Sequence, residues 1–198
     1  MAGGTFDNWT EADAIDLVRE YPMAWLVSGG EAFAATPLPL LPDLDGDGRL
    51  VGLTGHMARA NPHVARLRER PRAYVLFQGS HGYISPSWFR DRSRAPTWNY
   101  AILKIEADIV FDPAGVDEAL QRLVETMEKD RPRPWSADEM GPRYERLRRG
   151  VVAFQARIVS LAGRFKLGQD EPDEVYEDIM AEVGGSDLGG WMSRLGRL

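Results

Sequence analysis

The stretch MAWLVSGGEAFAATPLPLLPDLDGDGRLVGLT, residues 23–54, decides the fold. Met23 to Ser28 is a short apolar run followed by the pair Gly29-Gly30, which is typical of a strand that ends in a hairpin turn. Glu31 to Leu41 then predicts a second strand. The turn-forming residues Asp43 to Gly48 separate it from a third strand at Arg49 to Thr54. Three strands at hairpin spacing predict an antiparallel sheet.

The rest of the chain extends this sheet and adds helices. Strands are predicted at Ala73 to Gln78, His81 to Ser85 after a turn at Gly79, Asn99 to Phe111, and Val151 to Leu161. Helices are predicted at Thr10 to Glu20, after Asn61-Pro62, after Asp112-Pro113, from Ser136 to Arg148, and at Asp173 to Val183. Strands and helices do not alternate regularly. The pattern therefore predicts a mainly β (α+β) fold, an antiparallel barrel that is closed or partly closed, with peripheral helices.

Length and composition indicate an ordinary globular chain. With 198 residues, 43% of them hydrophobic, we expect one domain over residues 1–183 and a flexible, glycine-rich tail over residues 184–198, in which Trp191 could dock. The absence of cysteine excludes disulfides, iron–sulfur clusters and thiol nucleophiles. No signal peptide and no apolar run of bilayer length is found, so we expect a soluble, cytoplasmic protein.

No residue is singled out as catalytic or metal-binding. Residues 43–48 imitate the start of a calcium loop, but Thr54 stands where that loop needs a bidentate Glu, so a hairpin turn is favoured. The motif around Ser80 lacks the spacing of a nucleophile elbow. The three histidines include no pair at helical metal-ligand spacing.

One segment has the chemistry of an anion site. Residues 53–62, LTGHMARANP, run from a predicted strand end to a predicted helix start. Thr54 and Asn61 offer side-chain hydrogen bonds, Gly55 allows close backbone approach, and the helix start presents N–H groups and a positive dipole. Arg59 adds donors that match a phosphate. The alternative is that Arg59 is a surface residue on a helix cap, and the sequence leaves the two open.

Residues 36–42, TPLPLLP, are unusual for a strand. Pro37 and Pro39 both lack an N–H group, and at this spacing the missing donors point the same way. That edge cannot pair normally with a neighbouring strand, so it faces solvent, a bulge or a ligand. A plain edge or loop is the simpler interpretation.

Two aromatic and polar clusters, residues 82–89 and 96–100, flank an Arg-rich loop. They could cover a flat ring system with stacking faces and hydrogen bonds. They could equally form an oligomer interface or pack in the core. Spacing does not separate these three interpretations.

Taken together, these segments resemble the PaiB family of FMN-binding regulators, within the FMN-binding split-barrel group. The resemblance covers Trp9 to Asp170. The matching pieces are residues 38–41 (LPLL), 55–62 (GHMARANP), 73–77, 83–88 (YISPSW), 96–100 (PTWNY) and 163–169.

The resemblance implies a homodimer with FMN at the subunit interface. The strand with Thr36, Pro37 and Leu38 would run beside the isoalloxazine. The motif Thr54, Gly55, His56, Arg59, Ala60 and Asn61 would place the ribityl phosphate at Thr54 and at Arg59 to Asn61. Trp98 and Asn99 would reach the flavin from the partner chain, and Lys166 and Gln169 would close the site.

The resemblance also implies a negative transcriptional regulator, with DNA as a partner on family grounds alone. The net charge of −6 is unfavourable for non-specific DNA binding. Two other functions stay open: an FMN-dependent oxidoreductase, and a dimeric module that has lost its flavin. Pro37, Gly168 and Asp170 motivate the last, because the family typically has His, Ser and Asn there.

Overall fold

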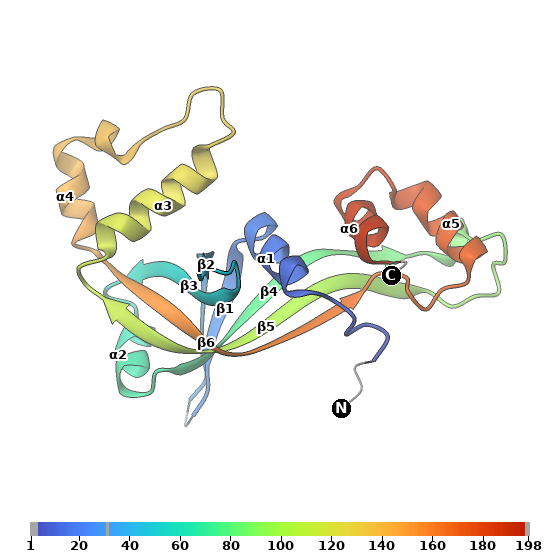
Figure 1. Ribbon diagram of the computed structural model, residues 1–198, viewed down its shortest axis with the longest axis horizontal. Coiled ribbons are helices and arrows are strands. Elements are labelled where there is room, and N and C mark those ends of the chain that lie inside the picture. Colours follow the sequence, from blue (N-terminus) through green and yellow to red (C-terminus); the bar gives the residue numbers. More distant parts are fainter. Residues whose placement is uncertain (1–3, 31, 197–198) are drawn as a thin grey trace. The chain divides into compact units, whose positions relative to one another are not determined.

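Six strands form the barrel of the chain. The computed structural model of the chain describes residues 4–30 and 32–196 (Figure 1). In these residues a closed barrel has the strand order β1-β2-β3-β6-β5-β4. The strands are β1 Met23–Ser28, β2 Ala34–Leu44, β3 Leu50–Ala58, β4 Arg72–Ile84, β5 Thr97–Asp112 and β6 Val151–Lys166. The predicted antiparallel barrel with peripheral helices is confirmed.

The chain divides into two compact units. Unit 1 comprises Met1–Tyr21, Phe77–Lys104 and Ala162–Leu198, and unit 2 comprises Pro22–Leu76 and Ile105–Leu161. The helices of unit 1 are α1 Glu11–Glu20, η1 Pro86–Trp88, α5 Asp173–Val183 and α6 Asp187–Leu195. Those of unit 2 are α2 Pro62–Glu69, α3 Val116–Glu128, η2 Ala137–Met140 and α4 Pro142–Arg148. Within the described ranges, no helix is long and apolar enough to cross a membrane.

Unit 2 is built on the two predicted hairpins. Strand β1 pairs antiparallel with β2, β2 with β3, and β3 with β6. Alternate residues point inward, as in any half-buried strand. Leu26, Leu40, Leu53 and Phe154 are all at most 1% exposed and form the centre of this core.

The connection from β5 to β6 is a helical arm in unit 2 (Figure 1). The sequence places a helix start at Asp112-Pro113, but α3 begins at Val116 because the Asp112 carboxylate caps the N–H of Ala114 in a preceding turn. The prediction of a single helix from Ser136 to Arg148 is wrong. Gly141 has φ of +53° and precedes a proline, so the chain breaks there into η2 and α4.

Unit 1 confirms the predicted first helix and corrects a predicted turn. Thr10 and Asp13 form a reciprocal capping box at the start of α1. Strand β4 runs straight through Gly79, where the sequence predicts a turn. The missing side chain instead makes room for Leu17 of α1, whose Cδ1 would lie 3.1 Å from an added Cβ.

The glycine-rich segment after residue 184 contains α6, where the sequence predicts a flexible tail. Trp191 is 1% exposed and donates its indole N–H to Glu20 at 2.9 Å. The Arg194 guanidinium lies 3.8 Å from the centre of the same ring. Tyr21 donates to Asp187, and burial together with this carboxylate raises the pKa of Tyr21 to about 12. Burial of one aromatic side chain and these polar contacts hold α6 against α1.

Candidate functional site

Strands β2 and β3 separate near residues 36–38 and 54–61, where the sequence predicts a binding site. Their ladder ends at the pair Leu40–Gly55. Beyond it, residues 36–39 of β2 pair with β1, whereas residues 56–58 of β3 pair with β6. Among the residues described, these two segments have no ladder to each other. The sheet of unit 2 therefore has a split bordered by residues 36–39 and 56–58.

The two prolines of β2 face this split. Leu40 donates its N–H to the Pro22 carbonyl at 2.9 Å, on the β1 side. Because N–H groups alternate between the two edges of a strand, positions 37 and 39 face the other edge. Both are proline, so that edge presents carbonyl oxygens and lacks donors at these positions. The expectation of an edge that cannot pair normally is confirmed.

A buried network of polar side chains joins β1, β2 and α2 beside the split. His63 is 3% exposed, and its Nε2 lies 2.8 Å from Ser28 Oγ. Its Nδ1 lies 2.9 Å from Thr36 Oγ1, and Asn61 Nδ2 donates to the same hydroxyl at 3.3 Å. Asn61 Oδ1 in turn accepts from the backbone N–H of His63. The network fixes Thr36 and Asn61, two predicted site residues, in one place.

Neutral imidazole suits this network. One ring nitrogen donates and the other accepts, so both hydroxyls can be satisfied. Burial, and to a lesser degree the charge of Arg66, lower the pKa of His63. Ser28 and His63 were missed by the sequence analysis. The only local signal is that His63 follows the Asn-Pro helix start, because Ser28 and Thr36 reach it through strand pairing.

The start of α2 differs from the expected anion site. Pro62 has no N–H, and those of His63 and Val64 are bonded to the side chain and the carbonyl of Asn61. These first-turn donors are therefore used within the helix cap. Arg59 is exposed and donates to the carbonyls of Arg149 at 3.1 Å and Val151 at 2.8 Å. Two backbone contacts thus orient the guanidinium, which has further donors.

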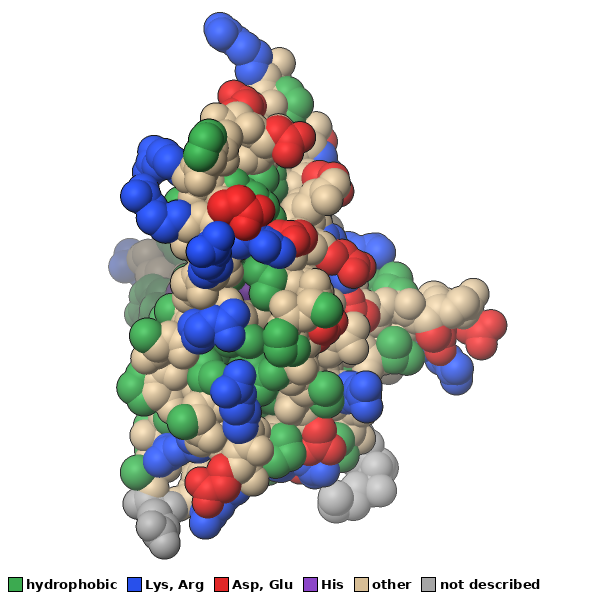
Figure 2. All heavy atoms as spheres, turned by 90° about the vertical axis from the view of Figure 1, so that its left-hand side faces the viewer, with side chains coloured by type: hydrophobic (Ala, Val, Ile, Leu, Met, Phe, Trp, Pro, Cys, Tyr) green, Lys and Arg blue, Asp and Glu red, His purple; other side chains and the backbone are tan. Residues whose placement is uncertain are grey.

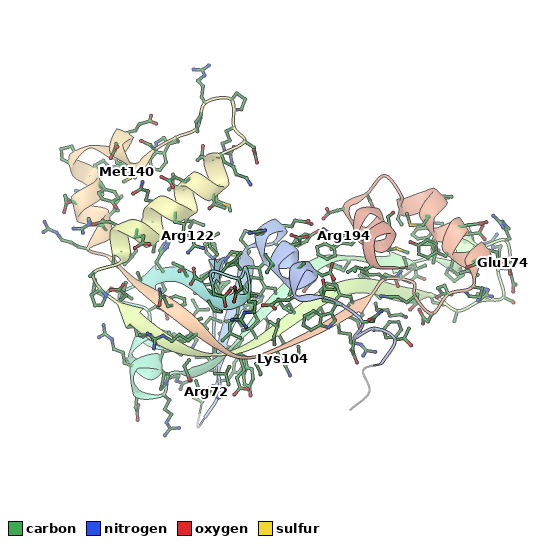
Figure 3. All side chains as sticks on the ribbon, viewed as in Figure 1. Arg72, Lys104, Arg122, Met140, Glu174 and Arg194 are labelled. Atoms are coloured by element: carbon green, nitrogen blue, oxygen red, sulfur yellow. The ribbon has the colours of Figure 1, made fainter. Side chains whose placement is uncertain are left out.

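Thr54 and Gly55 were expected to contact a bound anion, and in the structure both contact other residues of unit 2. The Thr54 hydroxyl lies 2.8 Å from Asp43, and Arg122 of α3 contacts both residues. Figure 3 shows Arg122 on α3 in the arm. An added Cβ on Gly55 would collide with Leu40 and Phe154, so packing of the core requires a glycine at this position.

The remaining predicted residues of unit 2 lie along the split. His56 is half-buried, and burial lowers its pKa. Leu38 points into the core, whereas Pro37 and Ala60 are exposed. In unit 2 the structure therefore brings Thr36, Pro37, His56, Arg59, Ala60 and Asn61 to the borders of the split or to the turn that follows it. The side chains of Thr54 and Leu38 point elsewhere, and Gly55 is packed against Leu40 and Phe154.

In unit 1, Trp98 and Asn99 point to opposite faces of β5. Trp98 is 49% exposed and stacks on His81 with ring centres 6.0 Å apart. Asn99 is 1% exposed and donates weakly to the sulfur of Met192 in α6. Its Oδ1 has no hydrogen-bond partner within the part of the chain that the structure describes. Within one subunit, the two side chains cannot contact the same face of a ligand.

Lys166 and Gln169 are both engaged within unit 1. Lys166 donates to the Thr97 hydroxyl at 2.5 Å. Gln169 closes the turn at Gly168, which has φ of +90°, by accepting from Leu167 N–H and donating to the Phe165 carbonyl. The departure from the family serine at position 168 thus coincides with a backbone conformation that favours glycine.

A closed antiparallel barrel that splits between two strands gives the chain a split-barrel fold. Solved structures with this fold include the FAD and heme binding protein from Mycobacterium smegmatis (TM-score 0.59, 17% identity, 87% of this chain and 78% of that one). Another is the flavocytochrome Anf3 from Azotobacter vinelandii (TM-score 0.57, 16% identity, 86% and 74%).

The sequence narrows the class to a family. The model of the family described as "Putative FMN-binding domain" matches residues 4–160, and the chain belongs to this family, whose cofactor is FMN. It is 30% identical over 133 residues to the protease synthase and sporulation protein PAI 2 of Bacillus subtilis. This match covers 66% of the chain and 64% of the relative's length. The resemblance to the PaiB type is confirmed.

Proposed function

We propose that the chain binds FMN at the split of unit 2, with Arg59 contacting the phosphate. One observation carries this proposal. The edges at residues 36–39 of β2 and 56–58 of β3 do not pair with each other, and next to them lies the exposed Arg59, whose guanidinium is held by two backbone carbonyls. The β2 edge offers carbonyl acceptors to ring N–H groups, and Arg59 offers donors to an anion. Thr36 and Asn61, held by His63, would add hydroxyl and amide contacts.

The residues at the split of one subunit offer a charged partner for the phosphate of FMN and carbonyl oxygens for one edge of its ring. When bound, FMN supplies one- or two-electron redox chemistry, and the protein supplies binding, orientation and exclusion of water. Here Arg59 would hold the phosphate, and the proline edge of β2 would orient the ring. Trp98 and Lys166 of a partner subunit would complete the site from their unit 1.

We expect Arg59→Ala to weaken FMN binding about ten- to a hundredfold, because a hydrogen bond to a charged group contributes about 1.5–3 kcal/mol. Titration of flavin-free protein with FMN, followed by flavin fluorescence, measures this loss. Arg70→Ala is the matched control, since Arg70 is exposed at the far end of α2 and should leave the affinity unchanged. Equal affinity of the Arg59 and Arg70 variants would place the phosphate elsewhere.

The proposal includes a homodimer. Met23 and Trp25 of β1, and Tyr74 and Leu76 of the neighbouring strand β4, are between 36% and 61% exposed on unit 2. Apolar, aromatic patches of this kind are typical of subunit interfaces. We expect Trp25→Glu to convert a dimer into a monomer in sedimentation analysis, and FMN affinity to fall with it if the site is shared. A monomeric parent protein would contradict this part of the proposal.

We propose further that the protein is cytoplasmic and serves as a regulator, as the family resemblance implies. Helix α4 in the arm carries the exposed side chains of Arg143 and Arg146, and Figure 2 shows Lys and Arg side chains, interspersed with Asp and Glu, over the face that it views. Such a face can contact phosphates of DNA. Steady turnover of a nicotinamide cofactor with an electron acceptor would instead favour the oxidoreductase alternative.

A further inference from the structure

The helical arm of unit 2 contains a hollow that the flavin proposal does not use. Helix α3, η2 and α4 line an open pocket of about 300 Å³, which adjoins a second lobe of about 220 Å³. The two lobes share Val124, Trp135, Ala137 and Tyr144 in their walls. Met140, labelled in Figure 3, lines the second lobe. Cavities of this size suit small organic molecules.

The second lobe of the hollow is apolar and incompletely covered. Helix α3 is strongly amphipathic, yet only Val116 and Ala119 on it are buried. Trp135 remains 39% exposed and Leu147 49% exposed at the wall of the hollow. Uncovered apolar side chains that converge on one cavity favour a ligand with an apolar body, because covering them removes apolar surface from water.

The first lobe carries unneutralised negative charge. Asp117 accepts from Tyr144 and is paired with Arg148. The carboxylates of Glu125 and Asp138 are both exposed at the rim of this lobe. The Glu125 carboxylate accepts from the neutral amide of Gln121 at 2.7 Å, and among the described residues no cation lies within ion-pair distance of either acid. The lining therefore combines two uncompensated carboxylates with two aromatic rings. Carboxylates and aromatic faces together favour a positively charged group.

We propose that this hollow is a binding site for a small organic cation, an ammonium that carries an aromatic or alkyl body. The ammonium contacts Glu125 and Asp138, and the apolar body covers Trp135 and Val124. The site is separate from the residues proposed for FMN. Helix α3 nevertheless carries both Glu125 of the hollow and Arg122, which contacts Thr54 on β3.

Calorimetric titration of the full-length protein with 2-phenylethylammonium and its neutral analogue 2-phenylethanol tests the charge preference. We expect the ammonium to bind about five- to tenfold more tightly than the alcohol. The double variant Glu125→Gln/Asp138→Asn should lose about tenfold in affinity for the ammonium and leave that for the alcohol unchanged. Trp135→Ala should weaken both ligands. Glu118→Gln, an exposed acid of α3 outside the hollow, is the control and should change neither.

Several outcomes would overturn the proposal. Equal affinities for ammonium and alcohol, or an ammonium affinity that the double variant does not change, would remove the role of the carboxylates. Absence of binding at millimolar ammonium would remove the site. If Trp135→Ala instead changes the oligomeric state while the ammonium does not bind, a second copy of the chain covers the hollow. Loss of FMN binding in Arg59→Ala has no bearing on these outcomes.

Discussion

The Trp191→Ala variant is expected to lose about 3–5 kcal/mol of unfolding free energy, the cost of removing a fully buried large aromatic side chain. Trp191 packs against Phe165 and Tyr21, with ring centres 5.9 and 6.2 Å away. Its removal also leaves Glu20 without the indole donor and Arg194 without the ring beneath it. Denaturant unfolding, followed by circular dichroism, measures the loss.

An exposed tryptophan provides the control for this prediction. Trp135 is 39% exposed, so Trp135→Ala should cost about 1 kcal/mol or less. If both variants unfold at the same denaturant concentration as the parent, α6 does not belong to the cooperative core of unit 1. If Trp191→Ala alone is destabilised, the segment after residue 184 is a structural element and not a tail.

The fold of unit 2 could be predicted from the sequence because its signals are local. The apolar run at residues 23–28, the glycine pair after it and the turn residues 43–48 indicate the two hairpins. The first connection is longer than the predicted Gly29-Gly30 turn, because Ser28 pairs with Ala34 and β2 begins there; Glu31, the predicted start of that strand, lies outside the described residues. Helix α6 could not be predicted in this way. Its interior contains Gly189 and Gly190, which are poor helix formers, and what stabilises it is the distant contact of Trp191 with Glu20.

The candidate site could be predicted only where its properties depend on neighbouring residues in the sequence. The Pro37 and Pro39 spacing shows an edge that lacks donors, because that property belongs to one strand. The role of Gly55 could not be read locally, because its space is filled by Leu40 and Phe154 from two other strands. Likewise, no sequence pattern places His63 between Ser28 and Thr36. Such contacts depend on strand register, which single-sequence patterns do not specify.

The His63→Leu variant is expected to lose about 2–4 kcal/mol of unfolding free energy, because buried polar groups left without partners cost about 1–3 kcal/mol each. Ser28, 3% exposed, would lose its imidazole partner and has little access to water, whereas Thr36 is only half-buried. The double variant Ser28→Ala/His63→Leu removes both members of the first pair. It should therefore be less destabilised than the sum of the single variants, which a double-mutant cycle measures.

The same residue should make stability depend on pH. Burial lowers the pKa of His63 below its value in the unfolded chain, so the unfolded state takes up the proton first as the pH falls. The stabilisation is present above the unfolded pKa of about 6.5 and is lost as the pH decreases through the folded value. His63→Leu should flatten this acid-dependent loss. The part of the acid-dependent loss of stability that comes from His56, whose pKa is also lowered, should remain in this variant. An acid profile identical to that of the parent protein would show that His63 is already charged, or exposed to water, in the folded state.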